Sequence, residues 1–144
     1  MSIPTKLLSD SKGTATDNSS FLSAKVKAFY FTAHWCPPCR VFTPFLAEIY
    51  KEVNKKEKEF EIIFVSSDKS KSEYESYFEE MPWLAVPFDD SETIKKLKTK
   101  YFVSGIPTLV IVDNEGNVLN EDGYLELSQS DDPVETINDW KSLY

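Results

Sequence analysis

The 144-residue chain is poor in the residues on which several large classes of protein depend. It has two cysteines, whereas a small secreted fold held by disulfides would need more of them, spread along the chain. Its four glycines form no glycine-rich loop of the kind that follows a strand and cradles the phosphates of a dinucleotide. No apolar run is long enough to cross a bilayer, and no signal-peptide pattern follows Met1. We therefore expect a soluble protein that is not exported and binds no dinucleotide.

Positive charge is also scarce in this chain. Lysine and arginine together number 16 against 24 aspartates and glutamates, which gives a net charge of −8 at pH 7. Such a chain repels polyphosphates and anionic lipids, so we expect neither nucleic acid nor a membrane surface as a partner. Apolar residues are plentiful by contrast, with 41% hydrophobic and 14% aromatic residues, enough for a single core at this length. We expect one folded domain and a monomer.

The pattern of apolar residues predicts strands that alternate with helices. Residues 1–20 are rich in Ser, Thr, Lys and Asp and predict a weakly ordered N-terminal extension or a short strand at 6–9, before a domain that covers 21–144. Continuous apolar runs predict buried strands, and apolar positions three and four residues apart predict helices. The predicted strands are 26–33, 60–66, 108–112 and 117–119; the predicted helices are one that begins at the cysteines, 71–80, and 91–101 with Ser91 as its N-cap.

The C-terminal segment differs from the rest of the chain in composition. Residues 121–139 contain seven acids and no lysine or arginine, which predicts a solvated acidic surface with a short final helix near 133–143. Before it, residues 114–116 predict a hairpin turn. The whole pattern predicts an α/β domain with a central mixed, mostly parallel sheet and helices on both of its faces.

The two cysteines, Cys36 and Cys39, form a CxxC motif between a buried strand and a helix. If Cys36 caps that helix, its sulfur lies where unpaired backbone N–H groups and the helix dipole favour a thiolate. Pro37 and Pro38 suit the first helical turn, and because Pro38 has no N–H, Cys39 should supply the capping donor. We therefore assign Cys36 as the attacking thiol and Cys39 as the buried resolving thiol of a thiol–disulfide exchange reaction.

The neighbouring residues leave alternatives open. A CxxC motif is also half of a zinc site, but His34 is the one histidine in the chain, so a carboxylate would have to complete four ligands, and we expect no metal. His34 either tunes the ionisation of Cys36 or is a loop residue that points into water. Arg40 either adds positive charge near Cys36 or is an ordinary surface side chain.

Several segments carry a family resemblance. FTAHWCPPCR at 31–40, FEIIFVSSD at 60–68, MPWLAVPF at 81–88 and GIPTLVIVD at 105–113 resemble tryparedoxins and nucleoredoxins, two branches of the thioredoxin superfamily, in the same order and spacing. The similarity runs from about residue 25 to about residue 119. It implies a thioredoxin-like fold whose redox-active disulfide, Cys36–Cys39, works without a bound cofactor.

The resemblance also implies roles for residues outside the cysteine pair. It implies a cis peptide at Ile106–Pro107 facing the cysteines, with the Ile106 backbone pairing against an extended substrate segment. It further implies that Trp35, beside Pro37, flanks the thiolate and shapes the docking surface. Trp83 would lie on a neighbouring loop, although plain core packing is the alternative for this residue and also for Trp35.

The chain departs from the family pattern at two places. Ordinary thioredoxins have a buried aspartate six residues before the first cysteine, where this chain has Tyr30, which we expect to be a packed strand residue. A phenol is a poor base at neutral pH, so the proton of Cys39 would leave through water or the departing thiolate. Tryparedoxins that use a polyamine thiol have an arginine-bearing segment after the last strand, and residues 120–130 contain no arginine.

The sequence thus predicts an enzyme that reduces disulfide-containing protein substrates through Cys36 and Cys39. Its electrons would come from an external donor, either a flavoprotein reductase or a low-molecular-weight thiol, because the chain has no dinucleotide loop of its own. A redox-sensing binding module similar to nucleoredoxin, which regulates a signalling partner, is the alternative. We expect a cytoplasmic protein, with the nucleus as a second location.

Overall fold

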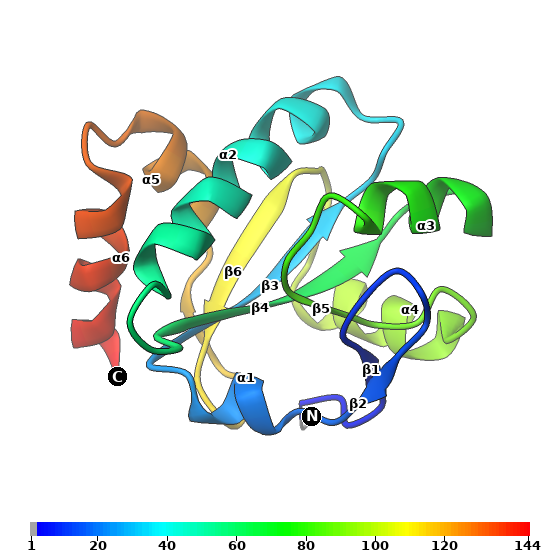
Figure 1. The fold of residues 1–144 in the computed structure, drawn as a ribbon, viewed down its shortest axis with the longest axis horizontal. Helices are drawn as coiled ribbons and strands as arrows, with labels where there is room; N and C mark the ends of the chain where they lie inside the picture. Colours follow the sequence, from blue (N-terminus) through cyan, green and yellow to red (C-terminus); the bar gives the residue numbers. More distant parts are fainter. Residues whose placement is uncertain (1–2) are drawn as a thin grey trace.

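The computed structural model describes residues 3–144; Met1 and Ser2, the first two residues of the predicted extension, lie outside the described residues. Within this range strands and helices alternate along most of the chain (Figure 1). The strands are β1 (Leu7–Leu8), β2 (Ala15–Thr16), β3 (Val26–Thr32), β4 (Phe60–Ser66), β5 (Leu84–Ala85), β6 (Thr108–Val112) and β7 (Val118–Asn120). The helices are α1 (Ser19–Ser23), α2 (Pro37–Val53), α3 (Lys71–Phe78), α4 (Ser91–Lys100), α5 (Gly123–Gln129), α6 (Pro133–Trp140) and the 3₁₀ helix η1 (Lys141–Leu143).

All seven strands of the described chain form one sheet, in the order β2-β1-β5-β4-β3-β6-β7. Strand β3 is central and pairs in parallel with β4 over its whole length. Of the described pairings, only β3–β4 and β4–β5 are parallel, because β6 runs antiparallel to β3 and a hairpin closes each edge. The sheet is mixed, as predicted, but the expectation that it is mostly parallel was wrong.

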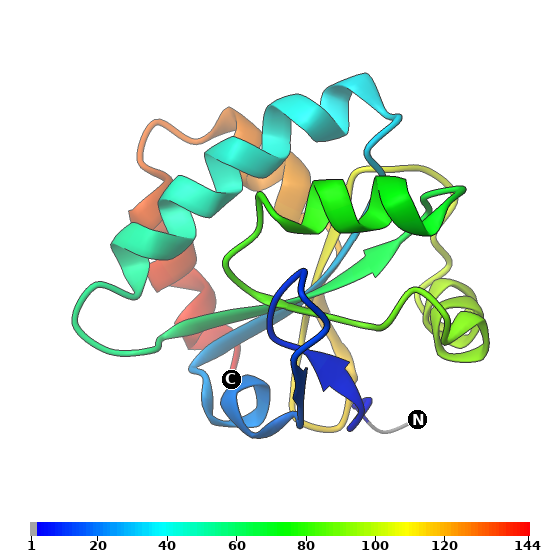
Figure 2. The same ribbon diagram turned by 45° about the vertical axis from the view of Figure 1, so that its right-hand side comes forward.

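Helices cover both faces of the sheet, as the sequence predicts. Because side chains alternate along a strand, Ala28 and Tyr30 of β3 face one side, and Phe29 and Phe31 face the other. The first side packs against α2, α3, α5 and α6, and the second packs against α1 and α4. Figures 1 and 2 show the two layers, with α2 and α3 on one side of the strands and α4 on the other.

The long apolar runs fold as their pattern predicts. Strands β3, β4 and β6 lie within the predicted ranges, and so do helices α3 and α4. The N-cap of α4 is Asp90 and not Ser91, because the Asp90 carboxylate accepts the N–H of Thr93. Strand β7 begins one residue later than predicted. The predicted short strand at 6–9 corresponds to β1, which joins the sheet through β5.

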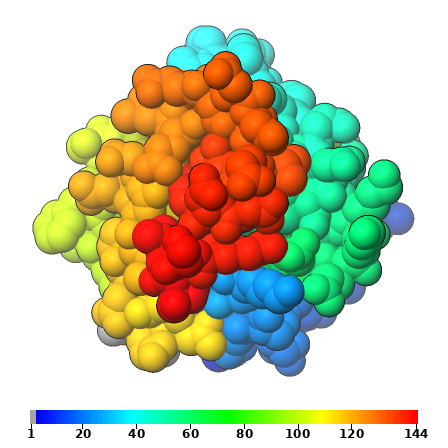
Figure 3. All heavy atoms as spheres, turned by 90° about the vertical axis from the view of Figure 1, so that its left-hand side faces the viewer, coloured from blue at the N-terminus to red at the C-terminus, as the bar shows by residue number. Residues whose placement is uncertain are grey.

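The acidic C-terminal segment holds more structure than the sequence predicts. Its seven acids are exposed, as expected, but α5 precedes the predicted final helix and was not predicted. Leu127, Ile137 and Trp140 are buried against the sheet and α2, and the Trp140 indole N–H donates to Glu126. Figure 3 shows this segment, orange to red, spread across one side of the molecule. It is therefore a cover for the core as well as a solvated surface.

Helix α5 can approach β6 closely because it begins at a glycine. A Cβ placed on Gly123 would lie 2.8 Å from the carbonyl oxygen of Leu109, a backbone atom that cannot move aside easily. We expect Gly123→Ala to lower the free energy of unfolding by about 1–3 kcal/mol, as overpacking does elsewhere. Urea denaturation measures this change. Gly105→Ala is the control, because nothing lies within 4 Å of its added Cβ. Equal midpoints for the two variants would contradict the prediction.

Candidate active site

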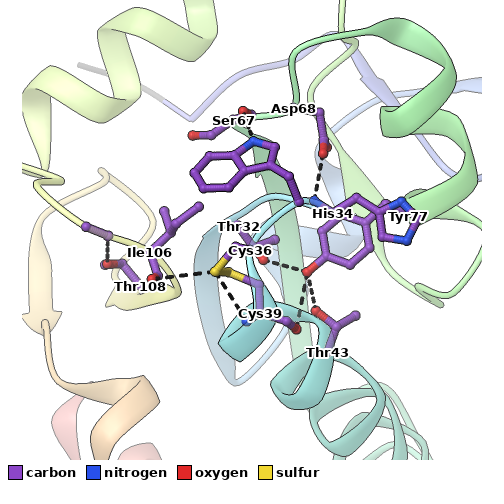
Figure 4. Close-up of a disulfide and its surroundings, with 12 residues drawn as sticks. Thr32, His34, Cys36, Cys39, Thr43, Ser67, Asp68, Tyr77, Ile106 and Thr108 are labelled. Atoms are coloured by element: carbon purple, nitrogen blue, oxygen red, sulfur yellow. Dashed lines mark hydrogen bonds between the residues drawn. A yellow bond between two sulfur atoms is a disulfide. The ribbon is translucent and has the colours of Figure 1, made fainter.

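Cys36 and Cys39 lie where β3 leads into α2, and their sulfurs are joined in a disulfide (Figure 4). Cys36 has extended backbone angles and is the N-cap of α2, while Cys39 lies inside the first turn. Cys39 is completely buried, whereas a small part of Cys36 reaches the surface. The helix begins here because Pro37 and Pro38 fill its first two positions, where no backbone donor is needed.

The sulfur of Cys36 takes the place of a capping oxygen. The backbone N–H of Cys39 donates to Cys36 Sγ at 3.4 Å, which confirms the predicted contact. The carbonyl oxygen of Cys36 accepts the N–H of Arg40 and so starts the helical hydrogen bonds. The Arg40 side chain is exposed. The Cys36 sulfur therefore rests on the positive end of the α2 dipole, an arrangement that favours negative charge on sulfur.

A cis peptide bond between Ile106 and Pro107 faces the disulfide. The Ile106 carbonyl oxygen lies 3.9 Å from Cys36 Sγ, and Pro107 is buried. The hydroxyl of Thr108 donates to the Gly105 carbonyl at 2.6 Å, which ties the loop together across this bond. The cis bond that the family resemblance implies is confirmed, and so is its position opposite the cysteines.

Trp35 lies beside the disulfide and is held in place although it is exposed. Its indole N–H donates to the Ser67 carbonyl at 2.9 Å, and the Lys69 ammonium lies 5.4 Å from the ring centroid. The side chain remains 46% exposed, and Pro37 next to the disulfide is exposed as well. These residues form an accessible surface around the cysteine pair.

His34 points away from the sulfurs. Its ring stacks on Tyr77, with centroids 5.1 Å apart and 6° between the planes, and its Nε2 lies 3.7 Å from a Glu80 carboxylate oxygen. Figure 4 shows the imidazole on the far side of Tyr77 from the disulfide. The backbone N–H of His34 donates to Asp68 at 2.7 Å. His34 thus fixes the loop before Cys36 through its backbone, and its ring does not contact the cysteines.

Asp68 is a site residue that the sequence interpretation missed. Its two carboxylate oxygens accept the His34 N–H and the Ser66 hydroxyl, each at 2.7 Å. Burial raises the pKa of this carboxyl group, and the two hydrogen bonds oppose that rise. Its position could have indicated this role, because Asp68 follows the end of β4 by two residues, and the carboxyl ends of the parallel strands β3 and β4 meet at one edge of the sheet.

Two aromatic residues singled out from the sequence are core residues. Tyr30 is buried on β3, as predicted, and its hydroxyl is within 2.7 Å of the Thr43 hydroxyl. Trp83 is also buried and packs edge-on against Tyr30 and Tyr50, so the core alternative is correct for Trp83. Tyr77, which the sequence interpretation did not select, joins the same hydroxyl cluster below the cysteines.

Neither a metal-binding cluster nor a membrane-spanning helix is found in the described part of the chain. Across residues 3–144 no group of three or more His, Cys, Asp or Glu side chains is arranged to hold a metal ion, so the zinc alternative gains no support. In the same range no helix has the length and apolarity that a membrane span requires.

A mixed sheet with helices on both faces, a CxxC disulfide that caps the helix after the central strand, and a cis-proline opposite it define a thioredoxin-fold protein. Residues 24–118 match the family model described as "Thioredoxin-like", and the chain belongs to this family.

Individual relatives agree with this assignment. Nucleoredoxin of Mus musculus is 43% identical over 120 residues, which cover 83% of this chain and 27% of the relative. Tryparedoxin of Trypanosoma brucei brucei is 45% identical over 92 residues, 64% of this chain and 63% of the relative. The predicted resemblance to both branches is confirmed. The chain spans about a quarter of the length of the nucleoredoxins that it matches.

Solved structures are similar over most of the chain. Thioredoxin from Wuchereria bancrofti has a TM-score of 0.80 and 41% identity, covering 100% of this chain and 99% of that chain. Tryparedoxin I from Leishmania major has a TM-score of 0.78 and 38% identity, covering 87% and 85%. The relatives and the Cys36–Cys39 pair together support a thiol–disulfide oxidoreductase.

Proposed function

We propose that the protein reduces disulfides in other proteins by cycling between a Cys36/Cys39 dithiol and the disulfide. The observation that carries the proposal is the capped sulfur of Cys36, which lies at the rim of the site while Cys39 is sealed below it. In the reduced protein the Cys36 thiolate attacks a substrate disulfide, and a mixed disulfide forms as one substrate thiolate leaves. Cys39 then attacks Cys36 and releases the second substrate thiolate.

The surface around the disulfide suits a polypeptide substrate. The Ile106 carbonyl faces Cys36 and can pair with an extended backbone. Val41 and Phe45, on the exposed side of α2, are 76% and 40% exposed, and together with Trp35 they offer apolar contact near the cysteines. We propose Trp35, Pro37, Ile106 and Pro107 as the substrate-binding residues. We also propose Arg40 and His34 as residues that affect the ionisation of Cys36. For His34, the position of the ring against Tyr77 favours a structural role.

We propose an external electron donor, because the cysteine pair can hold two electrons but needs a source for them. One solved relative is tryparedoxin II complexed with glutathionylspermidine, and this complex supports our proposal of a small thiol as a donor here. In this chain the segment 120–130 carries acids and no arginine, and Glu126 is engaged by Trp140 and Asn120. A flavoprotein reductase and a low-molecular-weight thiol are therefore both retained as donors to test. No bound cofactor is required.

A redox-sensing binding module is the second candidate function. The similarity to about a quarter of each nucleoredoxin, and the exposed Trp35, Val41 and Phe45 beside the disulfide, favour a surface that holds a partner according to its thiol state. In either role we propose a monomer that acts in the cytoplasm or the nucleus. The net charge of −8 supports protein partners over nucleic acid or membrane.

Reduction of insulin separates the two functions. With dithiothreitol as the electron source, we expect catalytic amounts of the protein to accelerate insulin precipitation, because each molecule of enzyme turns over many disulfides. A serum albumin sample at equal concentration controls for non-specific effects. Binding to a partner that depends on redox state, without any acceleration of insulin reduction, would favour the binding module instead.

A further inference from the structure

Four buried hydroxyl groups form a connected cluster beneath the disulfide. Tyr30 comes from β3, Thr32 from the end of the same strand, Thr43 from α2 and Tyr77 from α3. The Tyr77 hydroxyl is 2.5 Å from Thr32 Oγ1 and 2.6 Å from Thr43 Oγ1, and Tyr30 adds a contact of 2.7 Å to Thr43. All four side chains are fully buried. Figure 4 shows Tyr77 reaching between Thr32 and Thr43 toward Cys39.

The protons of this cluster can be placed by counting donors. Tyr77 also donates to the Cys39 carbonyl oxygen at 3.4 Å. Because each hydroxyl has one proton, Tyr77 must then accept from both Thr32 and Thr43, and Thr43 must accept from Tyr30. Every proton has an acceptor in this arrangement. The chain of donors runs from Tyr30 through Thr43 to Tyr77 and ends at Cys39.

The cluster is neutral at the place where ordinary thioredoxins have a carboxylate. The titratable groups around it are Tyr30, Tyr77, and, behind Tyr77, His34 with Asp68 and Glu80. Burial raises the pKa of Tyr30 and of Tyr77 above the ordinary value for tyrosine, so both keep their protons at neutral pH. The cluster therefore cannot act as a base toward Cys39, and its donor to that residue, the Tyr77 hydroxyl, is bound to the backbone carbonyl oxygen.

We propose that Tyr77 is a positioning residue for the resolving step, in which its hydroxyl, oriented by Thr32 and Thr43, holds the first turn of α2 through the Cys39 carbonyl oxygen and so keeps the Cys39 sulfur in line with Cys36. This inference rests on the proposed Cys36/Cys39 cycle. Loss of the Tyr77 hydroxyl removes a buried hydrogen bond to the turn that carries Cys39, and a displaced sulfur attacks Cys36 more slowly because the reaction depends on alignment.

The Cys39 thiol loses its proton to water, and its sulfur attacks Cys36 in the mixed disulfide. The Cys36–Cys39 bond forms, the bond between Cys36 and the substrate breaks, and the electron pair leaves on the substrate sulfur, which takes a proton from water. The cysteine pair is oxidised by two electrons and the substrate is reduced by the same two.

A single chromogenic disulfide, dithiobis(nitrobenzoate), can report both the attack by Cys36 and the resolution by Cys39. Reduced protein is mixed with an equimolar amount of this disulfide in a stopped-flow instrument. Attack by Cys36 releases a first coloured thiolate, and resolution by Cys39 releases the second. For Tyr77→Phe we expect the second phase to slow about tenfold with an unchanged pH midpoint, because the hydroxyl acts on the position of Cys39 and not on its ionisation. The first phase should be unchanged.

Tyr74→Phe is the matched control, because Tyr74 is also buried on α3 and donates to a backbone carbonyl, that of Val86, at 2.9 Å. We expect both phases of this variant to equal those of the wild type. A second phase of Tyr77→Phe with the wild-type rate overturns the inference, and so does a shift of the pH midpoint large enough to account for the slower phase. A missing first phase in the wild type would instead contradict the proposed function.

A pair of variants at Thr43 keeps the test decisive if Tyr77→Phe fails to fold. Thr43→Ser retains the hydroxyl that donates to Tyr77, and Thr43→Val removes it at almost the same volume. We expect Thr43→Ser to resolve at close to the wild-type rate and Thr43→Val to resolve several-fold more slowly. Equal resolving rates for the two variants overturn the inference.

Discussion

Replacing Cys36 with serine should abolish insulin reduction. The hydroxyl of serine forms no mixed disulfide, and Cys39, the other cysteine of the chain, is completely buried and cannot reach a substrate in its place. We expect a loss of more than about 10³-fold, on the scale that removal of a covalent nucleophile causes in other enzymes. The initial rate of insulin precipitation with dithiothreitol measures it.

The same experiment tests why Cys36 is reactive. In the reduced wild type, iodoacetamide labels Cys36 at a rate that rises with pH. We expect the pH at which this rate is half-maximal to lie well below about 8.5, the pKa of an ordinary thiol, because the sulfur lies on the positive end of α2. Reduced wild-type protein is the folding control, since Cys36→Ser removes the disulfide as well as the thiol. Retained turnover in Cys36→Ser, or labelling of Cys36 like that of free cysteine, would contradict the mechanism.

The parts of the fold that were predicted correctly rest on long apolar patterns. Strands β3 and β4 are buried along their whole length. Apolar residues fill most positions of each strand, and tertiary context seldom overrides such a pattern. Helix α5 was missed because it is short, has a glycine at its first position and buries Leu127 as its main core side chain. Contact with β6 stabilises this helix, and a local sequence pattern does not predict that contact.

In the candidate site, too, the features that depend on local sequence were predicted, and those that depend on tertiary neighbours were missed. The capping of α2 by Cys36 follows from local chemistry, since Pro37 and Pro38 fix where the helix starts. The cis bond at Ile106–Pro107 came from family resemblance and not from the residues. Asp68 and Tyr77 were missed because their roles depend on which strand and helix lie next to the cysteines. A carboxylate or hydroxyl in a polar stretch gives no sign of the backbone group that it will meet.

Replacing the buried Cys39 with serine should stop catalytic turnover and trap the mixed disulfide. Cys39→Ser keeps the attacking thiol and its place at the helix end, but the mixed disulfide that forms can no longer be resolved from within. We expect turnover with insulin to fall to nearly zero after a single reaction. Covalent adducts with disulfide-containing proteins should accumulate, and reducing agent should release them.

The adducts also identify partners, because each one links Cys36 to the protein that it was reducing. Affinity-tagged Cys39→Ser should capture specific proteins that mass spectrometry can name, and Cys36→Ser handled in parallel should capture almost none, since its remaining thiol is buried. A double variant with serine at both positions sets the background. If Cys36→Ser instead collects the adducts and Cys39→Ser does not, then Cys39 is the attacking residue, and the difference in burial between the two cysteines does not determine their roles.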